Sequence, residues 1–115
     1  MKRALIWAAA GAILVANSTI SIAAPVVVHV YNFDFSTGPS GSPVVDPTIN
    51  VGETVRWVWD SGFHSVQSIA GSAEVWNSPV TSTVGFTFDH TFNAPGMFPY
   101  HCSIHAGMVG TVVVQ

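Results

Sequence analysis

The stretch PTINVGETVRWVWD, residues 47–60, decides the fold. In its second half apolar and polar side chains alternate, so that Val55, Trp57 and Trp59 share one face of an extended chain. Successive side chains of a β-strand point to opposite faces, and this period of two is typical of a strand with one face in the core. Gly52 indicates a turn before the alternation begins. The stretch therefore predicts a strand, a turn and a second strand whose aromatic face lies inward.

Strand-like runs continue along most of the chain. They are rich in β-branched and aromatic residues, they are separated by Gly, Pro and Ser turns, and no window has the period of an amphipathic helix. Besides the pair in 47–60, we expect strands at residues 26–35, 64–70, 85–92, 97–102 and 109–115, and a loop at 36–43. No repeat or linker divides the chain. Seven or eight short strands predict an all-β fold, a Greek-key β-sandwich.

The N-terminus, MKRALIWAAAGAILVANSTISIAAP, has the three-part layout of a secretory signal peptide. Two basic residues precede an apolar run, and Ser21 and Ala23 form a small-x-small cleavage site. We therefore expect a signal peptide over residues 1–23, one domain over residues 24–115, and export to the periplasm or the outer cell-envelope space. The alternative is an uncleaved anchor, but the apolar run is shorter than the ~18–20 residues that a spanning helix needs. We expect no stable membrane span in the mature form.

The charge of the chain argues against one class of partner. The formal net charge is −3 at pH 7, and without Lys2 and Arg3 a single strong base, Arg56, stands against six acidic residues, which gives −5 with neutral histidines. A nucleic-acid-binding protein needs basic groups that neutralise phosphates. We therefore expect no nucleic-acid partner.

Export makes the single cysteine, Cys102, informative. Small secreted domains use cysteines in pairs as disulfides, and an exposed lone thiol is prone to oxidation. Three alternatives are open: a buried inert thiol, a disulfide to another chain, and a metal-bound thiolate. The surrounding stretch, YHCSIHAGM at residues 100–108, favours the third alternative because it also holds His105 and Met108.

A thiolate, an imidazole and a thioether in one short loop suit copper better than other common metals. A blue-copper electron-transfer site uses two histidines and one cysteine in a trigonal arrangement, with a weak axial methionine, so a second histidine must come from elsewhere. His101 adjoins Cys102 on one strand and points to the opposite face. His29 lies in the middle of a strand, and His90 lies on a face lined with phenylalanines. His64 opens a strand after DSGF, where a loop can bring a ligand to one end of a sandwich.

Other metal centres and enzyme chemistry fit the sequence less well. Structural zinc usually recruits more thiolates. A binuclear copper centre needs two bridging cysteines and a trinuclear oxidase centre needs His-x-His pairs, and the sequence has neither. No group at a recognisable position could orient a Cys–His pair for acyl transfer. We therefore do not expect an enzyme.

The chain resembles the cupredoxins, the small type 1 blue copper proteins of the plastocyanin, pseudoazurin and amicyanin group. The resemblance covers residues 26–115 and rests on the stretches INVGETVRWVW, FHSV, HTFNAPGMFPYHC and CSIHAGMVGTVVV. The loop spacing Cys102-x2-His105-x2-Met108 is similar to that of amicyanin. The resemblance implies one copper ion per chain, with His64 and His105 as imidazole ligands, Cys102 as the thiolate and Met108 as the long axial contact.

Two residues depart from the better-known members of the family. Ser65 stands where they have an Asn whose side chain braces the site, and Ile104 stands where they often have Pro. Residues next to the ligands tune a metal site, so these departures bear on the reduction potential and on the stiffness of the loop more than on copper binding.

The resemblance implies a monomer that carries single electrons by cycling between Cu(II) and Cu(I). A redox donor and acceptor would dock transiently near His105, within an apolar collar of Ile104, Ala106, Gly107 and Met108. Redox encounters usually have small interfaces. The alternatives are a cell-envelope copper carrier or storage protein without an electron-transfer role, and a metal-free structural sandwich. Only two methionines in the mature domain argue against a carrier with a Met-rich tract.

Overall fold

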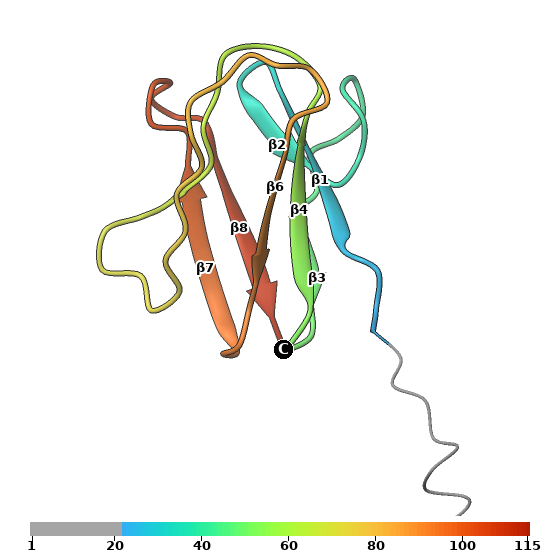
Figure 1. Cartoon of the computed structure of the whole chain (residues 1–115), viewed down its shortest axis with the longest axis vertical. Coiled ribbons are helices and arrows are strands. Elements are labelled where there is room, and N and C mark those ends of the chain that lie inside the picture. Colours follow the sequence, from blue (N-terminus) through green and yellow to red (C-terminus); the bar gives the residue numbers. More distant parts are fainter. Residues whose placement is uncertain (1–21) are drawn as a thin grey trace, which may run out of the picture.

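The computed structural model describes residues 22–115, so residues 1–21 of the expected signal peptide lie outside the described part. Eight strands form two four-stranded sheets that pack face to face (Figure 1). One sheet contains, in spatial order, β2 (Asp34–Ser36), β1 (Val26–Tyr31), β4 (Thr54–Trp59) and β6 (Thr87–Thr91). The other contains β3 (Thr48–Ile49), β8 (Val109–Val114), β7 (Gly96–His101) and β5 (Gln67–Ser68). The predicted all-β sandwich is confirmed, and within residues 22–115 no helix is long and apolar enough to cross a membrane.

The alternation in β4 has the predicted consequence for the core. Val55, Trp57 and Trp59 are completely buried, whereas the two residues between them are half-buried on the other face. β4 pairs in parallel with β1 and antiparallel with β6, so it lies inside its sheet. From the opposite sheet, Tyr100 of β7 meets Trp57 edge-on, with ring centroids 5.3 Å apart. Large aromatic side chains therefore fill the space between the two sheets, where each contributes a large buried apolar area.

The N-terminal strand differs from the prediction. The run at 26–35 is not one strand but two, β1 and β2, which pair antiparallel with Tyr31 opposite Asp34. The reversal takes place at Asn32 and Phe33, and Phe33 has a φ of 67°. Asn is a common turn residue, but the aromatic residues around it continue the strand-like pattern and hide the turn in the sequence. The hairpin brings Phe33 to one end of the sandwich.

The strand expected at 64–70 is also shorter than predicted. Of the segment 64–70, only Gln67 and Ser68 form a strand, β5, which pairs with β7. His64 makes an isolated antiparallel bridge to Thr81. The Val66 amide donates to Ser78 Oγ at 2.7 Å, so the backbone before β5 is bonded to the following segment instead of to a neighbouring strand of the sheet. The last two strands, by contrast, have nearly the predicted bounds, and β7 ends one residue before Cys102.

Close packing fixes the end of β7. Gly110 of β8 lies opposite Tyr100, and a Cβ atom at Gly110 would come within 2.6 Å of the buried Tyr100 ring. The ring thus occupies the space that a side chain at position 110 would need. This contact holds β7 against β8 just before the chain reaches Cys102.

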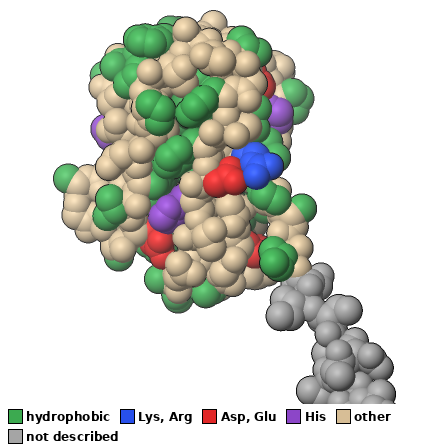
Figure 2. Space-filling view, viewed as in Figure 1, with side chains coloured by type: hydrophobic (Ala, Val, Ile, Leu, Met, Phe, Trp, Pro, Cys, Tyr) green, Lys and Arg blue, Asp and Glu red, His purple; other side chains and the backbone are tan. Residues whose placement is uncertain are grey.

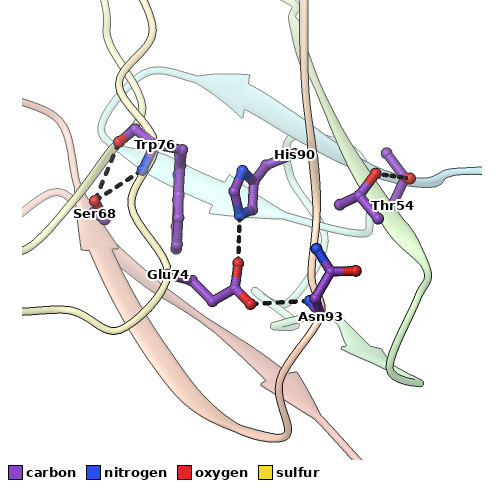
Figure 3. Close-up of polar contacts among 7 residues, drawn as sticks. Thr54, Ser68, Glu74, Trp76, His90 and Asn93 are labelled. Atoms are coloured by element: carbon purple, nitrogen blue, oxygen red, sulfur yellow. Dashed lines mark hydrogen bonds and ion pairs between the residues drawn. The ribbon is translucent and has the colours of Figure 1, made fainter.

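A polar clasp holds the long segment 69–86 against β6 (Figure 3). His90 donates from Nε2 to Glu74 Oε1 at 2.8 Å, and the Asn93 amide donates to Glu74 Oε2 at 2.9 Å. Trp76, which is buried, stacks on His90 with ring centroids 5.1 Å apart. His90 therefore has a hydrogen-bond partner within the fold, although it is only half-buried.

The clasp predicts a pH-dependent stability. Burial raises the pKa of Glu74, but the hydrogen bonds from His90 and from the Asn93 amide outweigh it, so that the pKa lies below its ordinary value. The ionised carboxylate therefore stabilises the fold above about pH 4.5, and this contribution is lost as the pH falls through the lowered pKa. We expect Glu74→Gln to lower the free energy of unfolding by about 1–2 kcal/mol at pH 7, because one clasp donor then faces an amide NH2.

Denaturant unfolding at pH 7 and at pH 3 measures this effect. The difference between wild type and Glu74→Gln should be smaller at the lower pH, because a larger fraction of Glu74 is protonated there. The matched control is Asp34→Asn, an exposed acid in β2, which should change stability little at either pH. An equal loss for Glu74→Gln at both values of pH would contradict the account.

Candidate metal centre

The side chains of His64, Cys102 and His105 lie close together. They follow β4 and β7, which finish at the same end of the sandwich (Figure 1). His64 Nδ1 lies 3.2 Å from His105 Nδ1, and Cys102 Sγ lies 3.5 Å from the same His105 atom. The ligand atoms of the three residues all lie within 4.8 Å of one another. His64 follows β4 in one sheet, whereas Cys102 and His105 follow β7 in the opposite sheet. The structure thus brings together three of the four predicted ligands from both layers.

The donor atoms fit a copper ion. The Nδ1 atoms of His64 and His105 face each other, and without a metal ion they can share only one proton. A cation among the three donors would instead accept a lone pair from each of them. A thiolate and two imidazoles form the trigonal set that copper electron-transfer sites use, with a weak thioether contact as the fourth member. The residues present therefore suit the metal that the sequence predicted.

Both inner donors are buried. His64 is fully buried and Cys102 is 2% exposed, whereas His105 is half-buried. Burial lowers the pKa of His64, the nearby His105 lowers it further, and the nearby backbone of Ser61 partly offsets the shift. His64 is consequently neutral at neutral pH, which is the form that binds a metal ion.

The backbone around His64 is held from two sides. Trp59 Nε1 donates to the His64 carbonyl at 3.2 Å, and this hydrogen bond is buried. Gly62 has a φ of 84°, and a Cβ atom there would lie 2.3 Å from His64 Nε2 and 2.8 Å from Asn32 Oδ1. Only glycine combines this backbone conformation with the space that the imidazole occupies. The DSGF stretch before His64 is therefore shaped to admit its ring.

The loop 102–108 closes on itself. The Cys102 amide donates to the Met108 carbonyl at 3.0 Å, and the Met108 amide donates to the His105 carbonyl at 3.1 Å. Gly107, with a φ of 85°, makes the turn between His105 and Met108. These bonds fix the short spacing of the three loop residues. The Met108 side chain is 1% exposed and belongs to the same buried core as Cys102.

The burial of Met108 corrects the expected collar around His105. Met108 does not contribute to the surface, whereas Ile104 is 45% exposed, and Ala106 and Gly107 are exposed as predicted. Sequence reasoning missed Phe33, whose ring lies 5.1 Å from that of His105. Nothing in the sequence around Phe33 indicated this contact, because it depends on the turn between β1 and β2. Figure 2 shows hydrophobic side chains gathered at the upper end of the molecule.

Ser65 braces the site in place of the Asn of better-known cupredoxins. The Ser65 amide donates to Cys102 Sγ at 3.4 Å, and Ser65 Oγ accepts a hydrogen bond from the Ser103 amide at 2.9 Å. The hydroxyls of Ser65 and Ser103 are also 2.8 Å apart. Two serines therefore connect the segment that carries His64 with the loop that carries Cys102, although neither side chain has the reach of Asn.

The other three histidines lie outside this cluster. His29 Nδ1 is 2.8 Å from Asp60 Oδ2, and His90 is bonded to Glu74. His101 pairs with Gln67 across β5 and β7, and its position in the strand alternates with buried Tyr100 and Cys102. Their placement agrees with the reasons for which the sequence disfavoured them as ligands.

Comparison with known proteins identifies relatives of the chain. The model of the copper-binding proteins of the plastocyanin/azurin family matches residues 45–115. A pseudoazurin from Methylorubrum extorquens is 33% identical, over 97% of this chain and 76% of the relative. A halocyanin from Natronomonas pharaonis is 39% identical, over 58% of this chain and 44% of its own length, so the chain spans less than half of that relative.

Solved structures agree in the fold. The oxidised form of an amicyanin variant superposes with a TM-score of 0.63 at 25% identity, and covers 78% of this chain and 81% of its own. A copper-containing nitrite reductase from Thermus scotoductus gives a TM-score of 0.68 at 25% identity, but the match covers only 24% of that chain. With its fold, its donor set and these relatives, the chain belongs to the plastocyanin/azurin family of copper-binding proteins, the cupredoxins, which generally carry electrons by means of copper.

Proposed function

We propose that His64, Cys102, His105 and Met108 bind one type 1 copper ion, and that the protein carries single electrons between redox partners. The observation that supports this most is the convergence of three donor atoms within 4.8 Å from segments thirty-eight positions apart in the sequence. When bound, copper would supply the Cu(II)/Cu(I) couple. The remaining steps depend on what the side chains of this chain do.

The buried residues would hold the ligands in one arrangement in both oxidation states. The backbone of His64 is tied to Trp59 and to Thr81, and the two serines tie its segment to the loop of Cys102. Ligands fixed in this way move little when the charge of the metal changes. Burial of His64 and Cys102 also keeps water away from the inner side of the site.

The exposed edge of the site would be the docking surface. His105 is the donor that reaches solvent, and the apolar side chains Ile104, Phe33 and Phe63 are exposed at 45%, 62% and 54%. A partner that covers an apolar rim does not have to strip water from charged groups, so docking carries little desolvation penalty. This suits a small transient interface. We propose that a redox donor and an acceptor both dock here and that the protein acts as a monomer.

Two other functions compete with electron transfer. A copper carrier or storage protein must release its metal, whereas here two donors are buried and braced by hydrogen bonds, which favours retention. An enzyme such as the nitrite reductase needs a place for substrate, and the donors here are enclosed except at His105. We therefore propose a carrier of electrons that is not an enzyme.

The direct test is to add Cu(II) to the purified domain. We expect an intense blue or green charge-transfer band, because a thiolate bound to Cu(II) in a trigonal site gives rise to it. Cys102→Ser should lose the band. The matched control, Ser65→Ala, removes a brace but no ligand and should keep an intense band. Absence of the band in the wild-type protein, or its persistence in Cys102→Ser, would contradict the proposal.

We also propose that residues 1–23 direct export and are removed. The layout of the sequence supports this, and Ala24 would then be the first residue of the mature protein. The intact mass of the protein recovered from the cell envelope measures the cleavage. Recovery of the full 115-residue chain from that fraction would contradict removal of the segment.

A further inference from the structure

Two properties of position 33 make a phenylalanine unexpected there. Among the described residues other than glycine, it alone has a positive φ, of 67°. Its side chain is also 62% exposed, so it gains little from burial in the core. A bulky side chain is a rare outlier in the left-handed region, and the second residue of a two-residue turn with this conformation is usually Gly or Asn. Neither local backbone preference nor burial explains a phenylalanine here.

The contact with His105 gives a reason for this residue. The two rings meet edge to face, with centroids 5.1 Å apart and an interplanar angle of 87°. On another side the His105 ring meets His64, with centroids 4.9 Å apart. The neighbours of His105 within its own loop, Ile104 and Ala106, are exposed. Phe33 is thus the aromatic side chain outside the proposed ligand set that contacts this ring.

The strained turn determines where the Phe33 ring points. β1 and β2 pair up to Tyr31 and Asp34, so the two residues between them must reverse the chain at the end of the sandwich. That end is where His105 emerges from the opposite sheet. The turn therefore bridges the two layers at the one proposed ligand that reaches solvent.

We propose that Phe33 is a positioning residue that restrains the His105 imidazole in the orientation needed for metal binding. This inference rests on the proposed function, in which His105 is a copper ligand. The ring of Phe33 limits rotation of the imidazole away from His64 and Cys102, and it does so at the expense of an unfavourable backbone conformation. Strain retained next to a site in this way is a common mark of a functional role.

The first test uses the metal-free protein. Phe33→Gly removes the ring and also suits the positive φ, so the variant should be at least as stable to denaturant as the wild type. Relaxation dispersion of the His105 ring carbons should nevertheless show larger exchange in the variant, because the imidazole is no longer restrained. Phe33→Leu, which keeps an apolar side chain without a ring, should lie between the two and serves if the glycine variant misfolds.

The second test uses the copper-loaded protein. Release of Cu(I) to a chelator should be about two- to tenfold faster in Phe33→Gly, the range expected for loss of one aromatic contact. The matched control is Met97→Ala, which removes an exposed apolar side chain at the opposite end of β7 from Cys102 and should release copper at close to the wild-type rate.

The outcomes separate this inference from the proposed function. If His105 dynamics and copper release in both Phe33 variants equal those of the wild type, the positioning role is wrong even though copper binds. If the wild-type protein gives no copper band, the proposed function is wrong, and the metal-free measurement still decides whether Phe33 restrains His105.

Discussion

The packing of Trp57 against Tyr100 is the interaction on which the rest of the structure depends. The two rings join one sheet to the other. Each ring also lies a few residues before a proposed ligand in the sequence: Trp57 precedes His64, and Tyr100 precedes Cys102. The hydrogen bond from Trp59 to the His64 carbonyl ties the aromatic core to the site directly. The spacing of the two sheets therefore sets the spacing of the donor atoms, and a stable core and a stable metal site have the same cause.

Much of this could be predicted from the sequence, because period-two alternation reports burial directly. The inward face of β4, the last two strands and the meeting of His64 with Cys102 and His105 were all predicted, and the structure has them. The errors fall where local pattern and tertiary contact disagree. The aromatic run at 26–35 hides a turn, and the segment after His64 bonds to Thr81 and Ser78 in place of a long strand.

Contacts across the two layers could not be predicted in this way. The Ser65–Ser103 brace and the Phe33–His105 contact join residues far apart in the sequence. The presence of a serine or a phenylalanine does not by itself indicate which residue it contacts. Gly62 and Phe33 both have positive φ, yet only the glycine suits it. A glycine that admits His64 and a strained phenylalanine against His105 together suggest that the loops around the site are shaped for the ligands more than for local backbone preference.

Anomalous diffraction at the copper edge from crystals of the copper-loaded protein tests the central claim most directly. The account predicts one peak per chain. The copper ion that it marks should be bonded to Nδ1 of His64, Nδ1 of His105 and Sγ of Cys102, with the Met108 sulfur as a longer fourth contact. A peak bound to other side chains, or one that lacks Cys102 or His64 among its ligands, would contradict it.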